Sequence, residues 1–269
     1  MSSYSSDTNN NLITSNYGLN VFVKKTYLCT GGAICSSIGL SKLGALVINT
    51  NEELLSDSLP MLYIIGSLMM LGGALTFDLK KYSIDDMVVY VNTMQKKISY
   101  STNSIQRILS YISMIIGSGL VMIPMFIRIP NVVFPAFIAS ASVFGGATWY
   151  AMTSINDELE EWGPTLYGGL SGLIGISLFG LGSYLIFGNN WFGDITHLID
   201  LYGGLILFTG LVAYHTNKSI KKYNSGCPDH LGCSAELYLD FINMFIRFMQ
   251  IINEINELDK KNSDEKEKK

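Results

Sequence analysis

Six polar side chains recur at helical spacing along the last apolar segment of the chain. Successive members are 4, 3, 4, 3 and 4 residues apart, which places them on one face of an α-helix: Glu236, Asp240, Asn243, Arg247, Gln250 and Glu254. The residues between them, from Leu237 to Ile252, are nearly all apolar. An ionisable group in such a segment is a candidate functional site, because its burial is costly unless it is paired, protonated or hydrated.

Two arrangements of this polar stripe are open. The helix could lie flat in a membrane interface, or it could sit inside a helix bundle and line a polar cavity. A flat interfacial helix is expected to carry a broad face rich in Lys and Arg. This stripe is one residue wide and mostly acidic. We therefore favour the buried arrangement.

His215 is a second polar residue in an apolar setting, within the stretch Leu211–Asn217. A single histidine near the end of a span is usually structural. Histidine is also the side chain that physiological pH switches most readily, so a functional role is open. Asp78 and Asp200 we interpret as markers of the ends of spans.

The elements that carry these residues follow from the distribution of charge. Only 15% of the 269 residues are charged and 48% are hydrophobic, whereas a soluble domain has about 25% charged residues. Four stretches of 20 to 32 residues contain no charge: 58–77, 108–127, 129–156 and 162–193. A bilayer core needs about 20 apolar residues per helix, so the chain is predicted to cross a membrane several times. The net charge of −4 provides no basic surface for nucleic acid.

The pattern predicts an all-α, polytopic membrane protein with seven transmembrane helices. The expected spans are 26–48, 60–78, 108–127, 132–153, 165–188, 198–216 and 234–253. This divides the chain into a flexible N-terminal tail (1–25), a transmembrane domain (26–253) and a charged C-terminal tail (254–269). The glycine-rich stretch 167–182 is expected to pack tightly among neighbouring helices, because small residues let helix backbones approach.

Basic residues indicate the orientation in the membrane. Ten of them fall on the side of the N-terminus: Lys24, Lys25, Lys80, Lys81, Lys96, Lys97, Arg107, Lys218, Lys221 and Lys222. Apart from the C-terminal tail, the opposite side has only Lys42 and Arg128. The positive-inside rule then places the N-terminus in the cytosol, or in the matrix if the membrane is mitochondrial.

Other reactive residues give weaker signals. Cys227 and Cys233 flank His230 before the last span; these three candidate ligands are a weak signal for a zinc site, which prefers four, and a disulfide is also open. Gly117-Ser118-Gly119 lacks the context of an intramembrane serine protease. We expect no catalysis, no resident metal and no cofactor.

Two stretches near the C-terminal end carry a family resemblance. Residues 202–220, with Tyr214-His215-Thr216-Asn217, and residues 236–247, with Glu236-Leu237-Tyr238-Leu239-Asp240, resemble the last two spans of the Bax inhibitor family. Residues 149–182 are similar to its growth-hormone-inducible transmembrane branch. The resemblance implies six helices around a central seventh and a pH-sensitive calcium leak or calcium/proton exchange, with calcium and protons as the transported ions.

The resemblance also implies roles for individual residues. In the family, a carboxylate near the end of span six faces one in the last span and shares protons with it; the second maps onto Asp240, while the first falls on His215. A histidine–aspartate pair stabilises the charged form of both partners and removes an oxygen ligand that calcium prefers. We expect Asp240 to gate the pathway with His215 as its titratable partner, and Glu236, Asn243 and Arg247 to line it.

The alternative is a non-conducting membrane protein that modulates apoptosis or organelle shape by interacting with other membrane or apoptosis-related proteins. The mitochondrial inner membrane is the favoured location and the endoplasmic reticulum the alternative.

Overall fold

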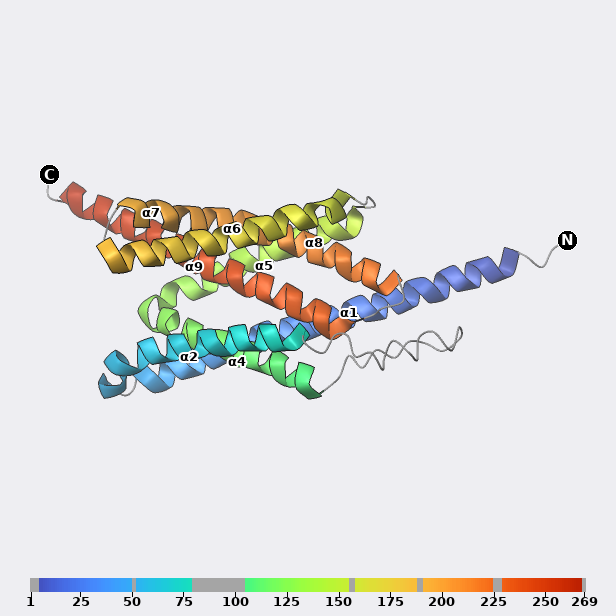
Figure 1. Cartoon of the computed structure of the whole chain (residues 1–269), viewed down its shortest axis with the longest axis horizontal. Helices are drawn as coiled ribbons and strands as arrows, with labels where there is room; N and C mark the ends of the chain where they lie inside the picture. Colours follow the sequence, from blue (N-terminus) through green and yellow to red (C-terminus); the bar gives the residue numbers. More distant parts are fainter. Residues whose placement is uncertain are drawn as a thin grey trace. The chain divides into compact units, whose positions relative to one another are not determined.

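The computed structural model describes residues 5–49, 52–78, 105–154, 158–187, 191–224 and 229–267. Within these ranges the chain forms seven continuous helical segments and no strand (Figure 1). They are α1 (Ser5–Asn49), α2 (Glu52–Asp78), α4 (Ile105–Arg128), α5 (Pro130–Thr153), α6 (Glu158–Phe187), the unbroken run of α7 (Trp191–Leu198), the π-helical turn η1 (Ile199–Gly203) and α8 (Gly204–Asn224), and α9 (His230–Glu267).

The helices confirm the predicted all-α membrane architecture. Among the described residues, five helical stretches are long and apolar enough to cross a bilayer: Gly18–Asn49, Leu59–Phe77, Ile105–Arg128, Pro130–Thr153 and Gly193–Asn224. Helices α6 and α9 lie where the fifth and seventh spans were predicted. The chain is therefore an all-α polytopic membrane protein.

Several helices extend beyond the predicted spans. Helix α1 begins at Ser5, inside the region expected to be a flexible tail, and α9 continues to Glu267 through the charged C-terminal region. In that region Asn253 Nδ2 donates to Glu257 Oε1 at 3.0 Å, one turn along the helix. The division into two tails and a seven-helix domain stays a prediction. Lys80, Lys81, Lys96 and Lys97, used above for the orientation, lie outside the described residues.

The chain divides into two compact units, and the first comprises residues 1–123 and 218–238. Within it, α2 and α4 pack through small residues (Figure 1). A Cβ added to Gly66 would lie 2.7 Å from the carbonyl oxygen of Gly117, and one added to Gly73 would lie 2.7 Å from that of Ser110. Side chains at these glycines would push the two helices apart, so glycine is what permits the close packing.

The second unit comprises residues 124–217 and 239–269. Its core includes an aromatic group in which Phe137 of α5 contacts Phe241 and Phe245 of α9, with ring centroids 6.1 and 6.5 Å apart. Aromatic pairs at these distances prefer the edge-to-face geometry observed here. This packing holds α9 against α5.

The prediction that the glycine-rich stretch 167–182 packs tightly is wrong for most of its glycines. A Cβ added to Gly168, Gly172, Gly175 or Gly182 would meet nothing within 4 Å. In the same stretch Ile174, Leu178 and Phe179 are more than half exposed. An apolar exposed face is stable in lipid, so the glycines there need no facing helix. Among the described glycines, the approaches to a neighbouring helix backbone closer than 3.0 Å are those between α2 and α4.

Candidate functional site

Helix α9 is buried on its polar and its apolar faces. Leu237 and Phe245 are completely buried, and Asp240 and Arg247 are only 3% and 9% exposed. A helix lying flat in an interface would keep its charged residues in water. Asp240 and Arg247 are thus buried, as the inward arrangement predicts, while the other four members of the stripe are partly exposed.

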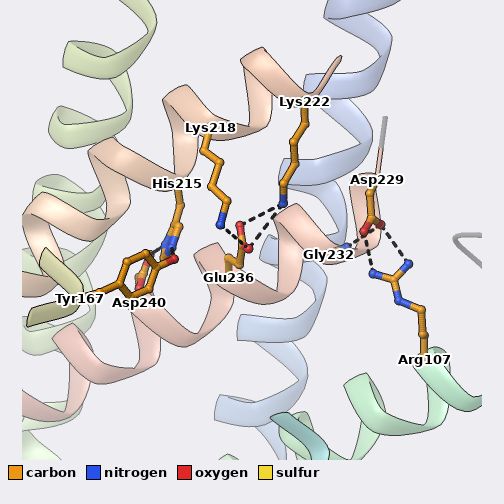
Figure 2. Close-up of polar contacts among 9 residues, drawn as sticks. All are labelled: Arg107, Tyr167, His215, Lys218, Lys222, Asp229, Gly232, Glu236 and Asp240. Carbon is orange, nitrogen blue, oxygen red and sulfur yellow. Dashed lines mark hydrogen bonds and ion pairs between the residues drawn. The ribbon is translucent and has the colours of Figure 1, made fainter. Parts of the chain in front are cut away.

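Asp240 contacts His215 in the second unit. Oδ2 of Asp240 lies 2.6 Å from Nδ1 of His215, and the two side chains are 4% and 7% exposed. The other imidazole nitrogen, Nε2, lies 3.1 Å from the hydroxyl oxygen of Tyr167. Figure 2 shows the three side chains converging from α9, α8 and α6. His215 and Asp240, the two residues predicted from the sequence, are therefore in direct contact. Tyr167 is a third member of the site that the sequence did not predict.

Helix periodicity explains why His215 points inward. Leu211 lies four residues before it on the same face of α8 and is 1% exposed, and the neighbouring Val212 is completely buried. The apolar face thus carries the imidazole into the interior of the second unit. There the carboxylate of Asp240 supplies the partner that a buried imidazole needs.

Glu236 belongs to a separate ion-pair cluster in the first unit. Lys218 Nζ donates to its Oε1 at 2.9 Å, and Lys222 Nζ lies 3.5 Å from both carboxylate oxygens (Figure 2). The three side chains are between 20% and 28% exposed. The contacts tie the end of α8 to the beginning of α9.

Arg107 and Asp229 form a buried pair that the sequence reasoning missed. Arg107 donates from Nη1 and Nη2 to the two carboxylate oxygens of Asp229 at 3.2 and 2.7 Å, and its guanidinium lies 4.5 Å from the ring centre of Phe77. Asp229 also caps α9, because its Oδ1 accepts from the backbone N–H of Gly232 at 2.9 Å (Figure 2). From the sequence alone, Arg107 is only one of the basic residues that indicate the membrane orientation.

This cluster also perturbs a neighbouring histidine, His230, the first residue of α9. Burial lowers the pKa of His230, and the positive charges of Lys25 and Arg107 lower it further, while Asp229 opposes the shift. The imidazole is therefore held toward its neutral form at this end of the first unit.

Arg247 and Asn243 have partners other than Asp240. Arg247 donates from Nε to the backbone carbonyl oxygen of Asp200 at 3.0 Å, and its Nη2 lies 3.1 Å from Asp200 Oδ1. Asp200 lies in η1, and π-helical turns are frequent at functional sites. A Cβ at Gly204 would collide with the guanidinium. Asn243 Nδ2 donates to the carbonyl oxygen of Leu239 in its own helix at 2.8 Å.

Metal-binding chemistry has little support in the part of the chain that is described. No group of three or more His, Cys, Asp or Glu side chains there could hold an ion. Cys233 is a free, buried thiol and so does not form the disulfide that the sequence allowed, and Cys227 lies outside the described residues. The chemistry that the site offers is proton exchange on His215 and Asp240.

Comparison with known proteins places the chain in a family. A family model described as inhibitor of apoptosis-promoting Bax1 matches residues 19–257. Bax inhibitor 1 of Homo sapiens is 40% identical over 83 residues, which are 30% of this chain and 33% of that protein. Growth hormone-inducible transmembrane protein of Rattus norvegicus is 29% identical over 114 residues, which are 40% of this chain and 32% of that protein.

Bax inhibitor 1 of Oryza sativa subsp. japonica is 29% identical over 134 residues, or 49% of each chain. The matched stretches thus span only a third to a half of these relatives. No solved structure matches the chain. Because the family model covers residues 19–257, including both predicted motifs and the His215–Asp240 pair, the chain belongs to the Bax inhibitor family of membrane proteins.

Proposed function

We propose that this protein provides a pH-sensitive pathway for cations, calcium above all, across an intracellular membrane, as a leak channel or a calcium/proton exchanger. One observation carries the proposal: Asp240 and His215, both buried in the second unit, are in contact at 2.6 Å. A buried pair of titratable groups is costly to maintain and is typical of ion and proton pathways in membranes. Membership of the Bax inhibitor family supports the membrane setting.

In this proposal, the contact between Asp240 and His215 is the gate. At low pH the imidazolium of His215 and the carboxylate of Asp240 form an ion pair that occupies the carboxylate and holds α8 against α9. At higher pH His215 loses its charge, and the carboxylate becomes available to a hard cation such as calcium. Acid therefore favours the closed state. Asn243 and Arg247, which follow Asp240 on the same stripe of α9, line the same pathway in the second unit.

Calcium efflux from proteoliposomes tests this function. We expect efflux through the wild-type protein to rise between pH 5.5 and 8, and Asp240→Asn to reduce it about tenfold or more, because the amide carries no charge to attract the cation. His215→Asp should shift the pH profile, because two carboxylates would share protons. Glu254→Gln is the matched control, since Glu254 is on the same stripe but its side chain is 36% exposed. Unchanged rate and pH profile in Asp240→Asn would contradict the proposal.

A second function is favoured by a specific observation. Glu236 is paired with Lys218, and Asp240 is paired with His215. Each of these acids therefore already has a basic partner within the protein. Such pairing is also what a non-conducting protein needs to bury its charges. In that case the protein would act by binding other membrane or apoptosis-related proteins. Purified protein that moves no ions in the efflux assay at any pH would support this second function.

We place the protein in the mitochondrial inner membrane, with the endoplasmic reticulum as the alternative, and we expect no enzymatic activity. The similarity to growth hormone-inducible transmembrane protein supports that family branch. Imaging of a C-terminally tagged protein with markers for both organelles tests the location. Signal confined to the endoplasmic reticulum would overturn the mitochondrial assignment.

A further inference from the structure

Tyr167 connects the buried His215–Asp240 pair to the surface of the second unit. Its hydroxyl oxygen lies 3.1 Å from Nε2 of His215, on the side of the ring opposite Asp240 (Figure 2). Tyr167 is 42% exposed, whereas the side chains of His215 and Asp240 are 7% and 4% exposed. The three side chains thus form a continuous hydrogen-bonded row that leads from the interior to an exposed phenol.

The chemistry of the three groups determines the direction of each hydrogen bond. An ionised carboxylate can only accept, so Nδ1 of His215 carries the proton that binds Asp240. In the neutral imidazole Nε2 is then an acceptor, and the Tyr167 hydroxyl donates to it. In the imidazolium both nitrogens donate, so the Tyr167 oxygen accepts and its own O–H is free to point elsewhere. The hydroxyl direction therefore follows the charge of His215.

We propose that Tyr167 relays protons between His215 and water, so that α6 controls the protonation of the His215–Asp240 pair. The gating role of the pair rests on the proposed function above. The relay itself depends only on the hydrogen bonds and can be tested without transport.

The proton balance of the relay is simple. A hydronium ion delivers a proton to the phenol oxygen while the phenol's original proton moves to Nε2. One O–H bond of the hydronium ion and the original O–H bond of the phenol break, a new phenol O–H bond and an N–H bond at Nε2 form, and Tyr167 remains a neutral phenol. His215 becomes an imidazolium, so the net charge of the three side chains rises from −1 to 0. Release of a proton follows the reverse path.

The position of Tyr167 along α6 indicates which side of the membrane exchanges protons with the relay. Tyr167 and Trp162 lie in the first ten residues of α6, and Tyr and Trp are enriched at membrane interfaces. Three lysines follow His215 before α8 ends: Lys218, Lys221 and Lys222. By the positive-inside rule this is the side of the N-terminus. The relay therefore exchanges protons with the compartment that the N-terminus faces.

Several charged or titratable groups surround the imidazole of His215, and one of them provides a control for the test. Asp240 faces it from α9, Tyr167 from α6, and Tyr214 from α8 itself, with the Tyr214 and His215 ring centroids 5.4 Å apart. Lys218, three residues after His215 in α8, and Glu236, four residues before Asp240 in α9, are paired with one another at 2.9 Å. Tyr214 is thus a matched control, because its ring packs on the imidazole while the contact with Nε2 comes from Tyr167.

Nitrogen NMR of the full chain, labelled with ¹⁵N-histidine and reconstituted in lipid nanodiscs, tests the relay directly. His215→Gln assigns the signal, because the chain has only 3 histidines. We expect neutral His215 to be protonated on Nδ1 and unprotonated on Nε2. Tyr167→Phe should change the Nε2 shift and move the titration midpoint by about 0.5 to 1 unit, the three- to tenfold effect of one hydrogen bond. Tyr214→Phe should leave both values unchanged.

Two results would overturn the relay. One is a neutral His215 that carries its proton on Nε2 in the wild-type protein, which needs no variant to observe. The other is a Tyr167→Phe protein whose Nε2 shift and midpoint match those of the wild type.

Transport measurements separate the relay from the proposed function. After a pH jump on the N-terminal side, calcium efflux through Tyr167→Phe should respond about tenfold more slowly than through wild type or Tyr214→Phe. Efflux that depends on Asp240 with an unaltered response in Tyr167→Phe would contradict the relay alone. A wild-type protein without calcium efflux would contradict the proposed function, and the nitrogen spectra would then decide on the relay.

Discussion

At the scale of residues, acids in apolar surroundings meet bases supplied by distant parts of the chain. The partners are 18 positions apart for Glu236 and Lys218, 25 for Asp240 and His215, 47 for Asp200 and Arg247, and 122 for Asp229 and Arg107. A charge removed from water is costly unless it is paired, so such pairing is expected. The identity of each partner depends on how the helices pack.

This explains which site residues could be predicted. Asp240, Glu236 and Arg247 stand out because they interrupt an apolar segment, and His215 stands out for the same reason. Tyr167 and Arg107 do not, because a tyrosine near a span end and an arginine before a span are ordinary features of membrane proteins. Their roles emerge only when α6 and α4 are placed in three dimensions.

The Arg107–Asp229 pair provides a stability prediction at this scale. Asp229→Asn keeps the oxygen that caps α9 but removes the charge that Arg107 needs, and the two side chains are only 6% and 12% exposed. Losing one partner of a buried pair costs about 3–5 kcal/mol. We expect a clearly lower Tm in detergent than for the wild type or for Glu254→Gln.

A double change controls this prediction. Arg107→Met together with Asp229→Leu removes both charges, so it should recover much of the lost stability, although the cap of α9 is lost as well. An Asp229→Asn protein as stable as the wild type would show that the pair contributes little.

At the scale of elements, spacing predicts helices and their polar faces better than it predicts which helices pack together. The stripe of α9 was predicted with its burial, because a 3–4 residue period defines one helical face. The packing of the glycine-rich stretch 167–182 was not predicted correctly, because glycines permit close packing without requiring it. Gly175 of α6 faces open space, whereas Gly117 of α4 touches the backbone of α2.

These two glycines give a matched prediction. Alanine in place of glycine favours a helix by about 1 kcal/mol, so Gly175→Ala should be neutral or stabilising. A Cβ at Gly117 would lie 2.6 Å from the carbonyl oxygen of Gly66, so Gly117→Ala should separate α2 from α4 and lower the Tm. Thermal unfolding in one detergent compares the two variants. Equal Tm values would contradict the close packing described for the first unit.

At the scale of the whole molecule, the distribution of charge was the most informative signal. Each of the seven predicted spans coincides with a helical segment, because a bilayer requires long apolar helices. The helix ends were not predictable from hydropathy, which marks the part of a helix that is compatible with lipid. Helices α1 and α9 accordingly extend far beyond their predicted spans.

The membrane orientation gives the polar groups a common direction. The count of basic residues predicts that the end of α8 and the start of α9 lie on the side of the N-terminus. The Lys218–Glu236 cluster lies at those helix ends. Along the chain, His215 is three residues before Lys218 and Asp240 is four residues after Glu236. A pathway controlled by His215 should therefore respond to the pH of one compartment.

The central claim is that the charge of His215 controls cation passage at Asp240. The most direct test is calcium efflux from proteoliposomes at pH 5.5 and pH 8 through the wild type and His215→Gln, whose amide cannot be protonated in this range. The account predicts about tenfold less efflux at pH 5.5 than at pH 8 for the wild type, and a difference of about twofold or less for His215→Gln. A His215→Gln protein that keeps the full pH dependence would contradict it.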